Sequence, residues 1–163
     1  MSKNQALIFA FLFFIIISSC QNRIFFEENV TITNEVWNTE GTPVFEVNVT
    51  DTLSFHNFFI NIRNTGDYEF MNLWVFVTTT FPNGRNFRDT IECPLADASG
   101  KWLGASATGS IFDSRIELDN KILYNTNIRF PMRGKYVFRF EQAMRRKELE
   151  NITDVGLRIE KSN

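Results

Sequence analysis

The amino-acid sequence predicts an all-β fold, namely an antiparallel β-sandwich of about eight strands with a jelly-roll-like topology. Residues that favour strands are abundant, since valine, isoleucine and threonine recur throughout and the chain has 18 phenylalanines. Short runs that alternate between apolar and polar residues are separated by turn residues. The body contains no long helical pattern, and strands spaced in this way are typical of sandwiches and barrels.

Residues 1–19 predict a lipoprotein signal peptide ahead of this domain. Lys3 and the free amine give a positive start, and residues 6–17 are apolar without a break. Such a run is too short to span a bilayer, which takes about 20 apolar residues, and it ends in small residues as secretory signals do. The sequence Ile17-Ser18-Ser19-Cys20 resembles the bacterial lipobox, so we expect cleavage just before Cys20 and acylation of its thiol. An uncleaved anchor and an ordinary secreted protein are the alternatives.

Residues 20–29 are interpreted as the acylated cysteine and its tether, and residues 30–163 as the sandwich domain. Each buried methylene of an acyl chain contributes roughly 0.8 kcal/mol, so two or more chains hold a protein firmly on a membrane. A diacyl or triacyl Cys20 would therefore anchor the protein without a transmembrane helix.

The composition limits the classes of function that the domain can have. Its length suits a single domain with one core. The formal charge of the whole chain is −2 and no basic run stands out, so we expect no nucleic-acid partner. Only two cysteines occur, and with Cys20 acylated, Cys93 has no disulfide partner. A lone cysteine in an apolar strand is typically a small buried side chain, and we expect that of Cys93.

The first half of the body predicts a series of strands that begins after Val30. These strands cover residues 44–49, 53–63, 70–81 and 87–95. The third of them is apolar on both faces, which favours a central position with Trp74 in the core. The turn residues Pro82-Asn83-Gly84 then predict a hairpin.

The second half of the body is less regular. Residues 96–112 are rich in glycine and other small residues and are interpreted as a loop that crosses the domain, whereas residues 111–123 are ambiguous. Residues 142–150 are interpreted as a single helical turn. Strands are predicted over residues 124–130, 134–140 and 155–160.

Residues of the kinds that carry catalysis or bind metals are scattered. His56 is the only histidine, and no set of three or four metal-ligand side chains shows a suitable spacing. No G-x-S-x-G motif marks a hydrolase nucleophile, and Asp89, Glu92, Asp97 and Asp113 form no recognisable glycosidase pair. We therefore predict a protein that is not an enzyme and has no metal or cofactor. His56 is interpreted as a strand residue with a satisfied hydrogen bond.

Two segments are predicted to bind a partner, because polar and aromatic residues on loops are where sites usually lie. The first contributes Lys101 and Trp102, from the sequence Gly-Lys-Trp-Leu-Gly. The second contributes Gln142, Arg145 and Arg146. Trp102 could also stack on a sugar, although packing over the edge of the sandwich is the plainer interpretation.

Two threonines are candidates for O-glycosylation. The sequences Asp51-Thr52-Leu53 and Asp89-Thr90-Ile91 have the Asp-Ser/Thr-hydrophobic pattern that is glycosylated on exported proteins of one bacterial phylum. The pattern is short, and Asp-Thr is equally a turn followed by a strand. Both interpretations stay open for Thr52 and Thr90.

Six motifs are specific in combination, because both their order and their spacing fit one pattern. They are Asp67-Tyr68 with Asn72-Leu73-Trp74, Asp89-Thr90-Ile91-Glu92, Leu95-Ala96-Asp97 with Gly100-Lys101-Trp102-Leu103-Gly104, Arg129-Phe130-Pro131 with Gly134-Lys135-Tyr136, Glu141-Gln142-Ala143-Met144-Arg145, and residues 154–161. The chain thereby resembles the gliding-motility lipoprotein family GldH of the Bacteroidetes, from about Trp37 to Lys161 and at the lipobox. It departs from the family pattern at residues 69–71 and 150–152.

The resemblance implies a cell-envelope lipoprotein that is needed for gliding over surfaces and works alongside other gliding lipoproteins and the associated secretion machinery. It implies no catalytic or ligand-binding residue, since the family has none to transfer. Surface-exposed lipoproteins of this phylum tend to carry acidic residues directly after the acylated cysteine. Here Gln21-Asn22-Arg23 follow Cys20 and the acidic pair Glu27-Glu28 comes late, which favours a periplasm-facing position in either the outer or the inner membrane.

We therefore predict a lipid-anchored, non-enzymatic envelope protein that supports gliding motility, its associated secretion machinery, or both. Its predicted partners are the membrane, through the lipid on Cys20, and other gliding-motility envelope lipoproteins. The alternative is a carbohydrate-binding envelope lipoprotein, which Trp102 and the sandwich pattern suggest.

Overall fold

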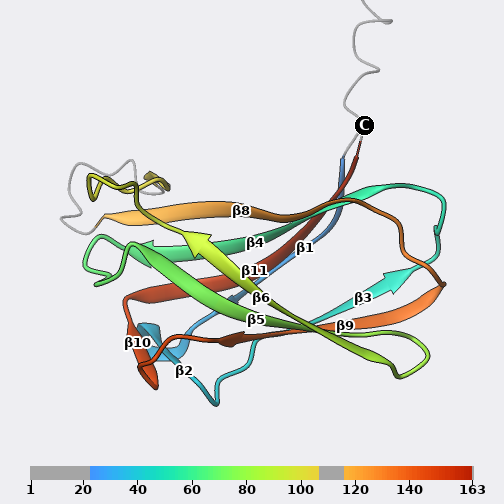
Figure 1. Cartoon of the computed structure of the whole chain (residues 1–163), viewed down its shortest axis with the longest axis horizontal. Coiled ribbons are helices and arrows are strands. Elements are labelled where there is room, and N and C mark those ends of the chain that lie inside the picture. The colour runs from blue at the N-terminus through green and yellow to red at the C-terminus, as the bar shows by residue number, and fades with distance from the viewer. Residues whose placement is uncertain (1–22, 107–115, 163) are drawn as a thin grey trace, which may run out of the picture.

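The computed structural model describes residues 23–106 and 116–162. In this part of the chain the regular structure is almost entirely β-strand, and two antiparallel sheets pack face to face as a sandwich (Figure 1). The predicted all-β sandwich is therefore confirmed.

Two large sheets and one small sheet account for all eleven strands of the described residues. The five-stranded sheet has the order β1 (Ile24–Thr31), β11 (Ile152–Lys161), β4 (His56–Thr65), β8 (Glu117–Ile128) and β7 (Ala105–Ser106). The four-stranded sheet has the order β3 (Val44–Val49), β9 (Gly134–Gln142), β5 (Asn72–Thr80) and β6 (Asn86–Pro94). A short pair joins β10 (Glu148–Glu150) to β2 (Val36–Asn38), and a 3-10 turn covers Thr33–Glu35.

The core lies between the two large sheets and follows from the alternation in the sequence. Because successive side chains of a strand point to opposite faces, every second residue of β3, β4, β9 and β11 enters the interior. The buried residues of these four strands include Phe45, Val47, Val49, Phe58, Ile60, Ile62, Tyr136, Phe138, Phe140, Val155, Leu157 and Ile159. Cys93 on β6 is also fully buried, as the sequence predicts.

Strand β5 is central in its sheet, between β9 and β6, but the prediction that Trp74 belongs to the core is wrong. Leu73, Val75 and Val77 fill the interior, so the alternate residues of the strand face outwards. Trp74 is 37% exposed, and its backbone amide meets the sulfur of Met144 at 3.4 Å. On the same outer face Phe76 is partly covered by Arg88, whose guanidinium lies 4.2 Å from the centroid of the Phe76 ring.

The folded domain begins earlier than the sequence predicts. Residues 24–29, which we interpreted as tether, belong to the edge strand β1 and pair with β11. The residues Ile24-Phe25-Phe26 give little indication of a strand in the sequence, because the partner strand β11 lies more than a hundred residues further along the chain. Cys20 and the signal peptide lie outside the described residues.

The irregular second half also differs from the prediction. Residues 117–128 form one long strand, β8, which joins the end of the ambiguous stretch to the first five residues of the strand predicted at 124–130. It bulges where it pairs with the start of β4. Residues 142–150 contain no helical turn, because the chain bends and then forms β10 against β2. The loop predicted over 96–112 lies partly outside the described residues.

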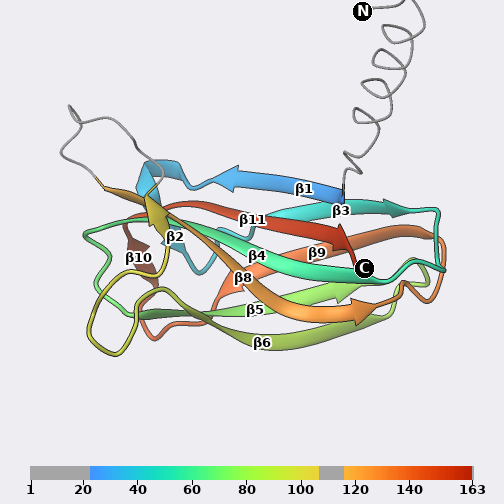
Figure 2. The same cartoon turned by 90° about the horizontal axis from the view of Figure 1, so that it is seen from above.

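The sandwich has two ends, which Figures 1 and 2 show at opposite sides of the molecule. The tether end holds the start of β1, the end of β11 and the turns at residues 50–55, 81–85 and 129–133. The distal end holds the bend at residues 66–71 and the loops at 95–104 and 143–147. Among the described residues, none belongs to a helix that is long and apolar enough to cross a membrane.

Candidate functional site

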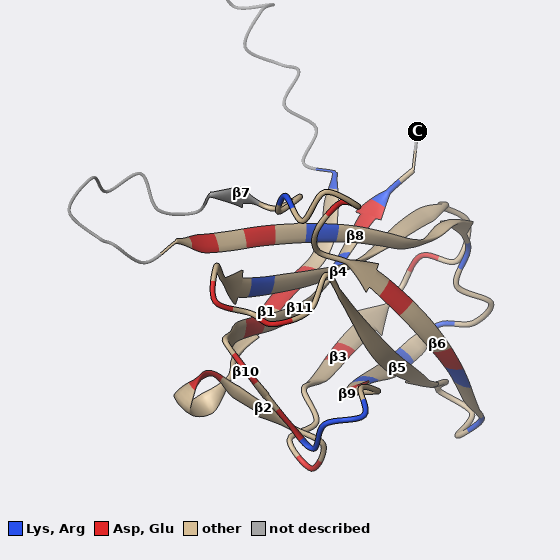
Figure 3. Cartoon of the chain, turned by 60° about the vertical axis from the view of Figure 1, so that its left-hand side comes forward, with Lys and Arg blue, Asp and Glu red and all other residues tan. Residues whose placement is uncertain are grey.

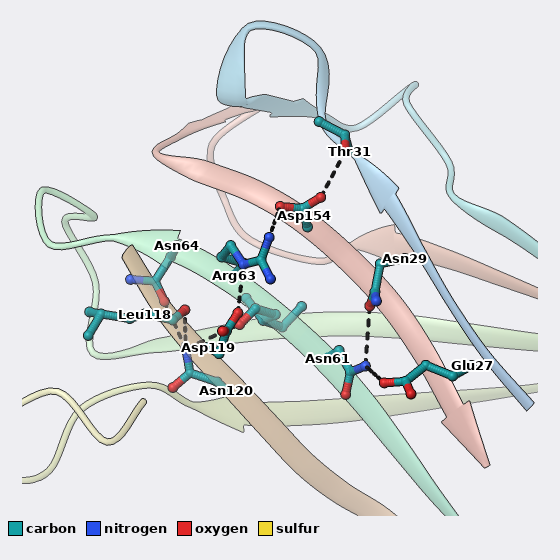
Figure 4. Close-up of polar contacts among 11 residues, drawn as sticks. Glu27, Asn29, Thr31, Asn61, Arg63, Asn64, Leu118, Asp119, Asn120 and Asp154 are labelled. Carbon is teal, nitrogen blue, oxygen red and sulfur yellow. Dashed lines mark hydrogen bonds and ion pairs between the residues drawn. The ribbon is translucent and has the colours of Figure 1, made fainter. Parts of the chain in front are cut away.

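The outer face of the five-stranded sheet carries a continuous layer of charged and amide side chains from β1, β11, β4 and β8. These strands carry both acidic and basic residues (Figure 3), and Figure 4 shows how several of the side chains contact one another. The strand register explains the arrangement, because Asn29, Gly156, Asn61 and Lys121 lie in one row across the sheet. We call this surface the polar face.

Arg63 on β4 connects two carboxylates of the polar face. Its Nε lies 2.6 Å from Asp119 of β8, and its Nη1 lies 3.2 Å from Asp154 of β11. Thr31 of β1 donates a hydrogen bond of 2.8 Å to the same Asp154. The hydrogen bond to Asp119 raises the pKa of the Arg63 guanidinium further above its ordinary value. These contacts link all four strands by their side chains.

A second group of charges lies further along the same strands. Arg158 donates to Glu27 at 2.7 Å and to Glu160 at 2.6 Å, and Lys121 lies 2.5 Å from Glu160. The hydrogen bond from Lys121 is the largest cause of the lowered pKa of the Glu160 carboxyl, and Arg158 adds to it. Each of these carboxylates is thus held by a cation, which suits recognition or stability better than proton transfer.

Gly156 lies between the two groups of charged residues and, because it has no side chain, leaves a shallow depression in the polar face. A Cβ atom at this position would lie 1.9 Å from Oδ1 of Asn29 and 2.8 Å from the carbonyl oxygen of Glu28. The Asn29 side chain therefore crosses the strand, and Asn61 donates to its Oδ1 at 3.2 Å and to Glu27 at 3.3 Å. A pocket of about 250 Å³ lies at this depression and is lined by the polar face.

The buried side-chain amides of Asn64 and Asn120 lie beneath the polar face at its distal side. Asn120 of β8 is buried, and its Nδ2 donates to Oδ1 of Asn64 at 2.9 Å. The same amino group lies 3.2 Å from the carbonyl oxygen of Ile62 and 3.3 Å from that of Leu118. Gly104 lies against this side chain, because a Cβ there would be 2.8 Å from Oδ1 of Asn120.

The first predicted partner-binding segment forms a tight turn at the distal end. Asp97 accepts hydrogen bonds from the amides of Ser99 and Lys101 at 2.8 and 3.1 Å and from the Ser99 hydroxyl at 2.6 Å. These bonds lower the pKa of the Asp97 carboxyl. The turn leaves Lys101 exposed, whereas Trp102 is half-buried and packs against the core.

The second predicted segment gives its residues different roles. Gln142 is only 4% exposed, and its side chain fastens the loop by donating to the carbonyls of Arg146 and Lys147 at 2.8 and 3.1 Å and accepting from the amide of Met144 at 2.8 Å. Gln142 therefore shapes the loop and does not present its own side chain. Arg145 and Arg146 are exposed.

The structure brings the two predicted segments together around one bend. The amides of Leu95 and Ala96 donate to the carbonyl of Met71 at 2.8 and 2.9 Å. From the other loop, Arg146 lies 2.6 Å from Glu69 and 5.5 Å from the ring centroid of Phe70. The sequence gives no signal of this proximity. Lys101, Arg145 and Arg146 thus belong to one end of the molecule, which we call the distal basic end.

The remaining candidates lie apart. Thr52 is half-buried in the turn before β4, and Thr90 is exposed on the edge strand β6. His56 is fully buried, and neither ring nitrogen has a hydrogen-bond partner within the described residues, so the predicted satisfied hydrogen bond is wrong. The rings of Phe25 and Phe130 pack on the imidazole at centroid distances of 4.8 and 5.2 Å, and burial lowers its pKa. The described residues contain no group of three or more histidine, cysteine or acidic side chains placed to hold a metal ion.

Comparison with known proteins decides the family. The family model described as GldH lipoprotein matches residues 24–159. The chain belongs to the GldH lipoprotein family. It is 37% identical over 164 residues to the "Gliding motility lipoprotein GldH homolog" of Christiangramia forsetii, covering 96% of each chain. It is 30% identical over 156 residues to the "Gliding motility lipoprotein GldH" of Flavobacterium johnsoniae, covering 91% of this chain and 92% of the relative. No solved structure matches the chain.

The GldH match begins and ends with the sandwich itself. Its first residue is Ile24, at the start of β1, and its last is Ile159, near the end of β11. The distal basic end lies within it, as does the polar face apart from Glu160. The resemblance seen in the sequence is therefore confirmed over residues 24–159.

This GldH domain has an apolar pocket that no pattern in the sequence predicts. The two sheets leave an opening between β6 and β8, where a largely apolar pocket of about 320 Å³ is lined by residues that include Phe58, Phe87, Tyr124, Phe130 and Tyr136. Burial raises the pKa of the Tyr124 hydroxyl. The pocket could not be predicted from the sequence, because its walls come from five separate strands, β4, β5, β6, β8 and β9, and from the turns before β6 and β9.

Proposed function

We propose that this GldH protein is anchored to a cell-envelope membrane by lipid on Cys20 and supports gliding motility without catalysing a reaction. Membership of the GldH lipoprotein family is the observation that carries the proposal. The lipobox ending at Cys20 supports the anchor. The ion pairs of the polar face support a binding or structural role rather than a catalytic one, since Arg63, Lys121 and Arg158 pair with its carboxylates.

The domain acts in this proposal as a binding module for other gliding lipoproteins or for the associated secretion machinery. The distal basic end is its docking surface, because it lies opposite the tether and therefore faces away from the anchoring membrane. We place the domain on the periplasmic side, since the acidic pair Glu27-Glu28 follows Cys20 only at a distance and lies within β1. Thr90 is the more accessible of the two glycosylation candidates.

The carbohydrate-binding alternative rested on Trp102 as an exposed stacking platform. Trp102 is half-buried against the core, so much of the ring is not available to a sugar. No other contact of the described residues favours a glycan at this loop. The half-buried ring therefore favours the proposal above over a carbohydrate-binding role.

Genetic complementation tests the motility proposal. Deleting the gene in the organism that carries it should abolish spreading on a surface, and the wild-type chain should restore it. A Cys20→Ala chain should fail to restore spreading, because it cannot be acylated. Normal spreading of the deletion strain would refute a role in motility.

Charge reversal tests the docking surface separately. The double variant Lys101→Glu/Arg145→Glu should restore spreading poorly and lose crosslinks to its partner, while keeping wild-type abundance. Lys135→Glu is a matched control, since Lys135 is an exposed cation on the four-stranded sheet that pairs with Glu46 at 3.1 Å. Equal complementation by both variants would refute docking through the distal basic end.

A further inference from the structure

We propose that the tether end of the sandwich is a second membrane contact. Leu53 and Phe55 enter the interfacial region of the bilayer, and three nearby cations, Arg23, Arg129 and Lys161, meet the lipid phosphates. We call this surface the membrane rim. The inference rests on the acylation of Cys20 proposed above and adds that the domain itself lies on the lipid surface.

The length of chain before the first strand holds the rim close to the membrane. β1 begins at Ile24, four residues after Cys20. A fully extended chain covers at most about 3.6 Å per residue, so the acylated cysteine and Ile24 are separated by no more than about 14 Å. This gap is scarcely wider than one helix, which is about 10–12 Å across. A folded partner therefore does not fit between the rim and the bilayer, which favours lipid as the occupant.

Large apolar side chains are exposed at this end. Leu53 is 79% exposed and Phe55 is 46% exposed. Ile24 and Ile128 are also among the exposed large apolar residues. Single exposed apolar residues are ordinary on a protein surface, but a group of them beside a lipid attachment point suits insertion at a membrane interface.

Backbone contacts show that these residues form one surface. The amide of Lys161 donates to the carbonyl of Arg23 at 2.8 Å, which joins the end of β11 to the residue before β1. The amide of Ser162 donates to the carbonyl of Phe55, also at 2.8 Å. The guanidinium of Arg129 lies 4.9 Å from the centroid of the Phe55 ring.

The turn that carries Leu53 is held in shape by Asp51. The Asp51 carboxylate accepts hydrogen bonds from the amides of Leu53 and Ser54 at 2.8 and 3.2 Å and from the Ser54 hydroxyl at 2.5 Å. These bonds lower the pKa of Asp51 to about 2, so the turn keeps its ionised cap at neutral pH. Leu53 is therefore presented on an ordered turn.

The charges of the rim complement phosphate groups. Arg23, Arg129 and Lys161 are all exposed. Asp51 is the acidic residue of the turn, while Glu160, the neighbour of Lys161, is engaged by Lys121 and Arg158 on the polar face. Arginine and lysine beside aliphatic and aromatic side chains are the combination found where proteins lie on anionic lipid surfaces.

The test uses the mature lipoprotein reconstituted in vesicles of phosphatidylethanolamine with a minority of phosphatidylglycerol. A polarity-sensitive fluorophore is attached at Leu53→Cys in one variant and at Leu103→Cys in another. Leu103 is a matched control, because it is 56% exposed and lies in the loop at the distal end. Cys93 is buried and stays unlabelled in the folded protein. Flotation of the vesicles reports the lipid anchor, and the fluorescence reports the rim.

We expect both variants to float with the vesicles. The label at residue 53 should shift its emission to shorter wavelength and be quenched by brominated lipids, and the label at residue 103 should do neither. If the protein floats with the vesicles but both labels emit as they do in water, the membrane rim is refuted and the lipid anchor is not. Protein that does not float would overturn the anchor, and the rim with it.

Unlabelled variants provide a second measurement that does not depend on a probe. Leu53→Ser/Phe55→Ser should raise the rate at which protease removes the domain from the vesicles through cleavage before Ile24. Met71→Ser/Leu103→Ser, which changes exposed apolar residues at the distal end, should leave that rate unchanged. Equal rates for the two variants would overturn the rim.

Discussion

The amide oxygen of Asn29 occupies the space that a side chain at Gly156 would fill, because a Cβ atom there would lie 1.9 Å from it. The two residues are partners in the register of β1 and β11. The Asn29 side chain lies across β11 in this way because residue 156 has no Cβ atom. This contact joins the strand that follows the proposed lipid anchor to the centre of the polar face.

Gly156→Ala should destabilise the domain by about 1–3 kcal/mol, the usual cost of forcing extra atoms into a packed site. The added methyl group would press on Asn29 and also on the carbonyl oxygen of Glu28, which lies 2.8 Å from the Cβ position. Urea denaturation measures the loss. Gly66→Ala is the control, since its Cβ would meet nothing nearer than 3.7 Å.

Asn29→Ala in the Gly156→Ala background tests the cause of this loss. Removing the Asn29 amide should restore part of the stability, whereas the clash with the Glu28 carbonyl remains. If the double variant is as unstable as the sum of the two single variants, the Asn29 contact is not the cause.

Asn120→Leu should destabilise the domain by about 1–3 kcal/mol, because it leaves buried carbonyl oxygens without their donor. The affected acceptors include Oδ1 of Asn64 and the carbonyl of Ile62. Thermal unfolding followed by circular dichroism provides the measurement. Leu123→Asn serves as a control on the exposed part of β8 and should change stability little. An unchanged midpoint for Asn120→Leu would contradict the proposed role of this amide.

His56 should make the domain less stable as the solution becomes acidic. Burial lowers the pKa of His56 in the folded state below its ordinary value of 6.5. The unfolded chain keeps the ordinary pKa, so as the pH falls through about 6.5 its His56 binds a proton while His56 of the folded chain stays neutral. The free energy of unfolding therefore decreases as the pH falls. Denaturation between about pH 7 and about pH 5.5 avoids most carboxylate titration. His56→Phe should remove this dependence, and an equal slope in both proteins would contradict the prediction.

Cys93 should be unreactive in the native protein. Burial raises the pKa of its thiol to about 12, and the thiolate is the reactive form. A chromogenic disulfide reagent at about pH 8 should leave the folded protein unmodified and react once denaturant is added. Ser99→Cys, in the exposed turn at the distal end, should react rapidly under native conditions. Rapid native labelling of Cys93 would show that β6 opens readily.

Much of the sandwich could be predicted from alternation alone. The inward residues of β3, β4, β9 and β11 follow a period of two, so alternation in the sequence indicates which residues of a strand share a face. Trp74 is the exception, because an apolar residue on the outer face of β5 cannot be told from a core residue by the local pattern, although it is 37% exposed. Local patterns report which residues share a face but not what lies over it.

The pairings that build the candidate site could not be predicted. β1 pairs with β11 at the opposite end of the chain, so Ile24-Phe25-Phe26 appears locally as a tether. The loops of Lys101 and Arg146 both contact the bend at residues 69–71, because the strands that precede them, β6 and β9, flank β5 in the four-stranded sheet. Gln142 was assigned to a binding surface from its polarity, whereas its amide is used inside the loop.

The mass of the mature N-terminus tests the central claim most directly. Protein isolated from the native envelope should yield an N-terminal peptide that begins at Cys20 and carries at least two acyl groups. Such a peptide places the lipid four residues from β1, as both the anchor and the membrane rim require. An uncleaved chain, or a mature chain with an unmodified Cys20, would contradict the account.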